Sequence, residues 1–200
     1  VVVAVSATNQ GRFNREAAQA LVAFKPVPIC NKELDSIWNH VKYATDDFMV
    51  INGGVPSGST YVLNGPVLYR LDSTYQLQHP QLNYGYSLVV KTNIGELSIP
   101  PNREGIDNTE GNASILQQKI DIVIEHHKEC LTRWVDTHLT NMTPLQLVRG
   151  VMDDKIVPPP TIAWFNQSIY GAIDKASDGG LTTVVDTIKE NLRRGFYPSS

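Results

Sequence analysis

A polar triplet directly after two prolines is the part of this sequence best suited to chemistry. The strand-like segment Leu97–Ile99 is stopped by Pro100–Pro101, and the triplet that follows is Asn102, Arg103 and Glu104. Arg103 could present a planar fork of N–H donors to a carboxylate or a phosphate. Glu104 could orient that fork or cap the helix expected next. Because an Arg-Glu pair is also common on ordinary surface loops, the residues alone leave both interpretations open.

A second group of candidate ligands lies in a region with helical spacing. His126 and Cys130 are four residues apart, so they share a helical face, and this is a spacing that two zinc ligands can have. No second pair stands at a suitable spacing, and His138 lies three helical turns, roughly 16 Å, beyond His127. We therefore expect core or boundary roles for these histidines and no metal site.

Composition and missing motifs exclude several classes of function. The chain has no G-x-S-x-G nucleophile elbow, no G-x-x-x-x-G-K-S/T loop and no G-x-G-x-x-G. A net charge of −3 gives no reason to expect nucleic acid as a partner. No apolar run approaches about 18 residues, so we expect no transmembrane segment. Two cysteines favour a reducing compartment, and the three Asn-x-Ser/Thr triplets are about as many as chance gives; they begin at Asn112, Asn141 and Asn166.

Periodicity predicts helices at both ends of the chain and strands in its middle. Helices are expected over 13–24, 116–138, 162–173 and 181–192. Another is expected to start at an Asn31 cap and to place Leu34, Ile37, Trp38 and Val41 on one face, and a further one to run from Thr143-Pro144 to Met152. Strands are expected over 1–7, 48–51, 60–63, 67–71, 86–92 and 96–99, with a linker over 153–160. Because regular strand–helix alternation fails in the middle, we expect an α+β (or α/β) fold in which helices pack on a mixed sheet.

The segment Gly95–Glu104, which reads G-E-L-S-I-P-P-N-R-E, resembles a family motif. It resembles the catalytic loop in the middle domain of the ninety-kilodalton heat-shock chaperones, which are GHKL ATPases. It is more similar to the segment G-x-L-x-I-x-P-S-R-E of the rIIA-type rapid-lysis proteins of T-even-like phages, with Asn102 in place of Ser. Val1–Val5 and Phe13–Pro26 resemble the end of the ATPase domain and its exit helix, and Tyr61–Leu71 loosely resembles a later segment.

The resemblance covers about residues 1–150 and implies both a fold and a division of the chain. The fold would be the transducer type, a ribosomal-S5-domain-2-like mixed sheet with packed helices, followed by a helical tail. Residues 1–25 would be the last strand and exit helix of an ATPase domain that is otherwise absent. Residues 26–156 would be the transducer-like domain, and residues 157–200 the helical tail.

The resemblance also implies a role for the polar triplet. Arg103, flanked by Asn102 and Glu104, would reach the γ-phosphate of ATP held in the preceding domain, where a fixed cation offsets the charge on the transferred phosphoryl group. Asp107 stands where the chaperones carry a Gln, and an acid there would repel phosphate. Because the GHKL motif D-x-G-x-G is missing, we expect no cofactor in this chain and no enzyme activity of its own. ATP and Mg would belong to the full-length protein.

The implied biology is the coupling of nucleotide state to lysis control. The expected partners are the missing ATPase domain and a further protein or a second copy of the chain. The expected location is the cytoplasmic side of an infected bacterial host, peripheral to its inner membrane. The alternative is a non-enzymatic structural or interaction domain of a phage, with helices in 161–200 as the docking surface.

Overall fold

The computed structural model describes residues 9–28, 34–71, 75, 77–78, 82–101, 105–165 and 173. The chain forms two compact units, Val1–Val123 and Ile124–Ser200. The division falls inside the long helix α2 (Glu110–Leu139), so one helix belongs to both units. The predicted domain boundaries after residues 25 and 156 stay predictions.

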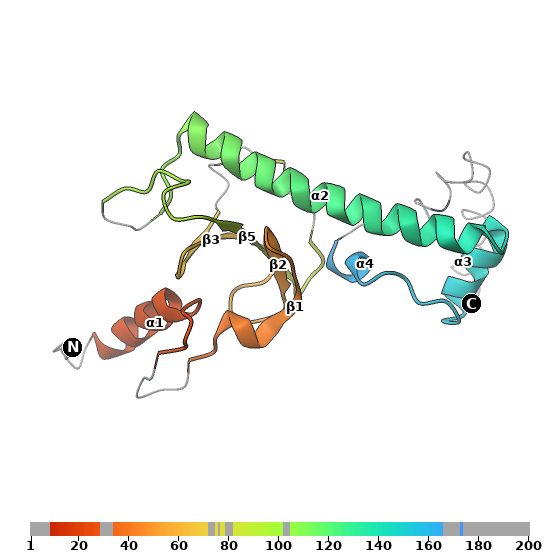
Figure 1. Cartoon of the computed structure of the whole chain (residues 1–200). Coiled ribbons are helices and arrows are strands. Elements are labelled where there is room, and N and C mark those ends of the chain that lie inside the picture. Colours follow the sequence, from red (N-terminus) through yellow and green to blue (C-terminus); the bar gives the residue numbers. More distant parts are fainter. Residues whose placement is uncertain are drawn as a thin grey trace, which may run out of the picture. The chain divides into compact units, whose positions relative to one another are not determined.

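The first unit is built on a five-stranded mixed sheet (Figure 1). The strands are β1 (Val41–Ala44), β2 (Phe48–Ile51), β3 (Thr60–Asn64), β4 (Val67–Arg70) and β5 (Ser87–Thr92). Their spatial order is β1-β2-β5-β3-β4, with β5 antiparallel to β2 and parallel to β3. The strand that comes last in the sequence is therefore central in the sheet. The α+β class with a mixed sheet is confirmed.

The hairpin between β3 and β4 follows from local turn chemistry. Asn64 pairs with Val67, which leaves Gly65 and Pro66 as the two turn residues. Gly65 has φ +59°, and glycine at the first central position is typical of a type II′ hairpin turn. The strands predicted on either side of Asn64-Gly65 are thus confirmed to within a residue at each end.

Both faces of the sheet are covered, which explains why β2, β3 and β5 read as nearly continuous apolar runs. Figure 1 shows the helix α1 (Gln10–Leu21) on one side and α2 on the other. The core on the α1 side joins alternate residues of the central strands to residues after α1 and to the short 3₁₀ helix η1 (Ile37–His40). Its members are Val22, Ala23, Ile37, Met49, Ile51, Tyr61, Leu63 and Val89.

The prediction of a full second helix through Ile37 and Val41 is wrong. Only η1 is helical, and the chain then enters β1, where Val41 pairs with Ile51. The Ser36 side chain accepts a hydrogen bond from the Trp38 N–H and donates one to the Val22 carbonyl oxygen, 3.1 Å away. These bonds fix the start of η1, and η1 ends after one turn at His40, where the next residue, Val41, pairs with β2. The expected Asn31 cap lies outside the described residues.

The strand predicted over 96–99 is also replaced, in this case by a turn. The Glu96 N–H donates to the Asn93 carbonyl oxygen at 3.0 Å, and the Glu96 carboxylate accepts from the Asn93 N–H at 2.8 Å. This reciprocal pair of bonds closes a turn directly after β5. The strand therefore ends at Thr92.

The predicted helices at 13–24 and 116–138 are confirmed as α1 and α2, with shifted ends. α1 stops at Leu21, ahead of the two prolines, and its residues are all at least partly exposed. α2 starts after Thr109, whose hydroxyl accepts from the Asn112 N–H at 3.2 Å. Lys119 of α2 pairs with Asp47 at 3.5 Å and Glu96 at 3.7 Å, which ties this half of α2 to the turns of the sheet. The predicted strand over 1–7 lies outside the described residues.

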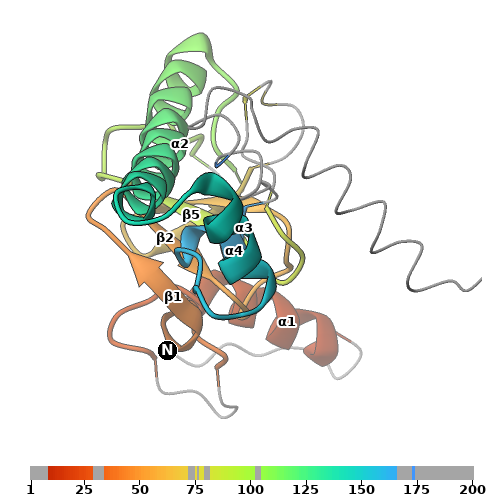
Figure 2. The same cartoon turned by 90° about the vertical axis from the view of Figure 1, so that its right-hand side faces the viewer.

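The second unit contains the C-terminal half of α2, α3 (Pro144–Met152) and the short α4 (Thr161–Trp164), which Figure 2 views from that end. Its core comprises Leu131, Val135, Leu147, Val148 and Ile173. The predicted linker over 153–160 is held to α2 by the Trp134 indole N–H, which donates to the Val157 carbonyl oxygen at 3.1 Å. α4 ends at Trp164, and nearly all of the remaining predicted tail lies outside the described residues.

The predicted start of α3 at Thr143-Pro144 is confirmed as a complete capping box. The Thr143 hydroxyl accepts from the Gln146 N–H, and the Gln146 side chain accepts from the Thr143 N–H at 2.8 Å. Thr143→Ala should therefore lower the free energy of unfolding by about 1 kcal/mol. Urea denaturation monitored by circular dichroism measures this loss. Thr137→Ala on the exposed face of α2 is the control, and an equal loss there would contradict the capping explanation.

Candidate functional site

The predicted triplet Asn102, Arg103 and Glu104 lies outside the described residues. The structure does describe the chain on both sides of it, namely 98–101 and 105–107. The geometry at the base of this loop can therefore be stated, while the roles of the three residues themselves stay predictions.

The two ends of the loop are hydrogen-bonded to each other at Ser98 and Asp107. The Asp107 N–H donates to the Ser98 carbonyl oxygen at 3.3 Å. The Ser98 hydroxyl donates to the Asp107 carboxylate at 3.1 Å. The Tyr75 hydroxyl adds a hydrogen bond to the Ile106 carbonyl oxygen. The described residues on the two sides of the triplet are therefore joined to each other through Ser98 and Asp107.

Asn112, in the first turn of α2, is the residue that holds this base to the helix. Its side-chain amide N–H groups donate to the carbonyl oxygens of Ser98 at 2.7 Å and Asp107 at 2.8 Å. Its side-chain oxygen accepts from the Ser98 N–H at 2.9 Å. Asn112 is only 3% exposed, and both polar ends of its amide are hydrogen-bonded. We call Ser98, Asp107 and Asn112 the loop clamp.

The loop clamp gives structural roles to two residues already noted in the sequence, Asn112 and Asp107. Asn112 starts an Asn-x-Ser triplet, but its buried, hydrogen-bonded amide cannot accept a glycan in the folded protein. Asp107 is used in part to accept the Ser98 hydroxyl, so its carboxylate has a structural role at the loop base. The sequence carried only a general signal for the clamp, since Asn side chains at the start of a helix commonly hydrogen-bond to nearby backbone groups.

The histidines and Cys130 lie on the second half of α2. The Cys130 Sγ atom lies 3.5 Å from Nε2 of His126. His127 is buried, and its ring lies 4.7 Å from the ring of Phe165 between centroids. His138 contacts the Trp134 carbonyl oxygen through Nδ1 at 2.8 Å. Within the described part of the chain, no three His, Cys, Asp or Glu side chains come together as metal ligands.

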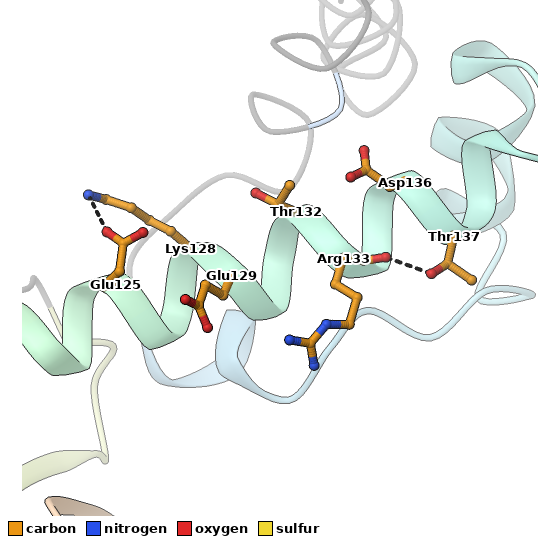
Figure 3. A pocket seen from close by; sticks show the side chains of 7 residues that line it. All are labelled: Glu125, Lys128, Glu129, Thr132, Arg133, Asp136 and Thr137. Carbon is orange, nitrogen blue, oxygen red and sulfur yellow. Dashed lines mark hydrogen bonds and ion pairs between the residues drawn. The ribbon is translucent and has the colours of Figure 1, made fainter.

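The exposed face of the same half-helix forms a shallow hollow (Figure 3). Lys128 pairs with Glu125 at 3.3 Å, and the Thr137 hydroxyl donates to the Arg133 carbonyl oxygen at 2.6 Å. All the side chains drawn come from one helix and carry mixed charge; they are Glu125, Lys128, Glu129, Thr132, Arg133, Asp136 and Thr137. This arrangement is an ordinary solvated helix face, and its side chains do not point toward a common centre as those of a binding site do.

Tyr61 is a buried titratable group in the sheet, away from the loop. Burial raises the pKa of Tyr61, while the charge of Arg70 and a hydrogen bond with Ser59 act in the opposite direction. Its hydroxyl donates to the Pro56 carbonyl oxygen at 3.1 Å. A raised pKa keeps the phenol protonated at neutral pH, so Tyr61 is a structural donor.

No family model, curated protein or solved structure matches this chain. Among the described residues, no helix combines the length and apolar character needed to cross a membrane. The functional assignment therefore depends on the residues of the loop and the geometry of its base.

Proposed function

We propose that this chain is the transducer-type part of an rIIA-like ATPase. In this proposal Arg103 contacts the γ-phosphate of ATP held by a nucleotide-binding domain, and the chain relays nucleotide state to a partner. The main support is the loop clamp, which attaches the Arg103-bearing loop to α2, the helix shared by both compact units. In this proposal, attachment of the loop base to the first turn of a long helix suits a relay better than a self-contained active site.

The physical role of Arg103 follows from the chemistry of phosphoryl transfer. Negative charge spreads over the oxygens of the transferred group, and a guanidinium already in position stabilises that charge. Arg also offers two parallel donors, which suits a phosphate better than a single ammonium group does. An Arg whose loop is anchored to a long helix would also report whether the phosphate is present.

The helix α1 is amphipathic in sequence, yet none of its residues is buried, and Phe13 is 42% exposed. The resemblance makes this helix the exit helix of an ATPase domain, so in this proposal that domain lies next to α1. By the resemblance, the full protein would control lysis from the cytoplasmic side of an infected bacterium, peripheral to its inner membrane.

Arg103→Ala tests the proposal in the protein that joins this chain to its nucleotide-binding domain. We expect kcat for ATP to fall at least about 100-fold, because one charge-stabilising donor is lost from the transition state. The melting temperature should stay within a degree or two of the parent. Steady-state ATPase assays and calorimetry give both quantities.

Arg133→Ala is the matched control, since it removes the same side chain from the exposed face of α2. It should leave kcat unchanged. Full turnover in Arg103→Ala would remove Arg103 from the mechanism and refute the proposed function.

A further inference from the structure

We propose that Asn52 is a site of spontaneous deamidation in the folded protein, a modification that converts its carboxamide to a carboxylate. The chain contains two Asn-Gly pairs, Asn52-Gly53 and Asn64-Gly65. Asn is a heat-labile residue, and a following Gly favours the reaction because it is conformationally free and has no Cβ to obstruct the reacting groups. The structure exposes the first Asn and buries the second. This inference does not depend on the proposed function.

The reaction joins the side chain of Asn52 to the backbone nitrogen of Gly53. That nitrogen attacks Cγ of Asn52, a bond forms between these two atoms, and the bond from Cγ to Nδ2 breaks. Nδ2 leaves as ammonia, taking up the proton that the Gly53 nitrogen gives up. Water then opens the succinimide ring at either of its carbonyl groups, which yields aspartate or isoaspartate. One water is consumed, one ammonia is released, and the product carries one more negative charge.

Both reacting groups are available at this position. β2 ends at Ile51, and the side chain of Asn52 is exposed. Among the described residues, neither the Asn52 carboxamide nor the Gly53 N–H has a hydrogen-bond partner. The Asn52 N–H, which takes no part in the reaction, donates to the His40 carbonyl oxygen at 3.0 Å. Gly53 has φ +130° and starts the irregular segment 53–58, so strand pairing does not restrain the bond that must rotate.

Asn64 has the opposite surroundings and serves as a comparison within the same chain. It is 7% exposed and is the last residue of β3. It pairs with Val67 of β4 on one side and with Thr92 of β5 on the other. Ring closure requires Cγ to swing over the nitrogen of Gly65, and pairing on both sides prevents this movement while the hairpin is closed. Asn64 should therefore react only through local opening of the sheet, which costs free energy.

Mass spectrometry of the aged chain tests the proposal. The folded protein is incubated at mildly alkaline pH and digested, and the peptides are fragmented so that the two sites are quantified separately. We expect Asn52 to deamidate at least about tenfold faster than Asn64, because only Asn64 needs local opening. The rate at Asn52 should rise with pH, since the Gly53 nitrogen must lose its proton. In urea the two sites should react at rates within about threefold of each other, because both are then unfolded.

Asn52→Gln is the matched variant, since it keeps the carboxamide on a longer side chain that would have to close a larger and slower-forming ring. It should remove the more acidic species that anion-exchange chromatography detects after ageing, with the melting temperature unchanged. Asn93→Gln is the control, because Asn93 is also exposed in a turn but is followed by the β-branched Ile94. It should leave the acidic species in place.

Two results on the unaltered chain would overturn the inference, whatever the variants do. One is a rate at Asn64 that equals or exceeds the rate at Asn52 in the folded protein. The other is a rate at Asn52 more than about tenfold lower in the folded protein than in urea, since the fold would then protect this pair as well.

Discussion

Leu88→Ala is expected to lower the free energy of unfolding by about 3 kcal/mol, the cost of truncating a fully buried leucine. Leu88 is 0% exposed and lies in β5, where it is paired with Val50 of β2 on one side and Thr60 of β3 on the other. Because β5 is paired with a strand on each side, the residues around Leu88 can move little to fill the space that the truncation leaves. Most of the cavity should therefore remain. Urea denaturation gives the change from the shift of the midpoint.

Leu145→Ala is the control for this prediction, since it removes the same atoms from a leucine that is 40% exposed. It should cost less than about 1 kcal/mol, as expected for a partly exposed site. The comparison matters because β5 joins the β1–β2 hairpin to the β3–β4 hairpin. Similar losses in the two variants would contradict the expectation that the cavity left by a fully buried side chain in β5 carries the larger cost.

Gly53→Ala should be comparably damaging, by about 3 kcal/mol, for two separate reasons. Gly53 has φ +130°, a conformation that is costly for any residue with a Cβ. An added Cβ would also lie 2.4 Å from Nδ1 and 2.9 Å from Cγ of the His40 ring. That ring is held in place by a hydrogen bond to the Asp35 carboxylate. Thermal and urea unfolding should both show the loss.

Two further variants divide this loss between its causes. Gly58→Ala has φ +73° with open space around the new methyl group, so it should cost only the backbone term of about 1 kcal/mol. His40→Ala combined with Gly53→Ala removes the clash and should recover part of the loss relative to Gly53→Ala. If the double variant simply adds the two single losses, the His40 contact is not the cause.

Local patterns were enough to predict the elements whose formation depends on local chemistry. The strands on either side of Asn64-Gly65 follow from their apolar runs, whereas their direct joining as a two-residue hairpin, with Pro66 in the turn, was decided by the structure. α3 follows from the Thr143-Pro144 cap. α2 follows from apolar residues at three- and four-residue steps. The strands β2, β3, β4 and β5 were also recognisable, because each is a short run rich in β-branched and aromatic residues. The class of the fold was predictable from the order of these elements.

Elements that depend on distant partners were predicted less well. Ile37 and Val41 have helical spacing, but Val41 pairs with Ile51 of β2 and therefore lies in a strand. Residues 96–99 have the apolar pattern of a strand, but Glu96 closes a turn and Ser98 bonds to Asn112, so these residues do not pair with the sheet. In both cases the competing hydrogen bonds come from contacts that a local apolar pattern does not reveal.

The candidate site shows the same division. The sequence by itself determined the chemical candidates, the triplet Asn102, Arg103 and Glu104 after two prolines, because residue type and proline position are local properties. Only the tertiary structure decided that Asn112 closes the base of this loop, because its partners Ser98 and Asp107 lie fourteen and five residues away. It also decided that β5 lies in the middle of the sheet, since strand order is set by which apolar faces can be buried together and not by order along the chain.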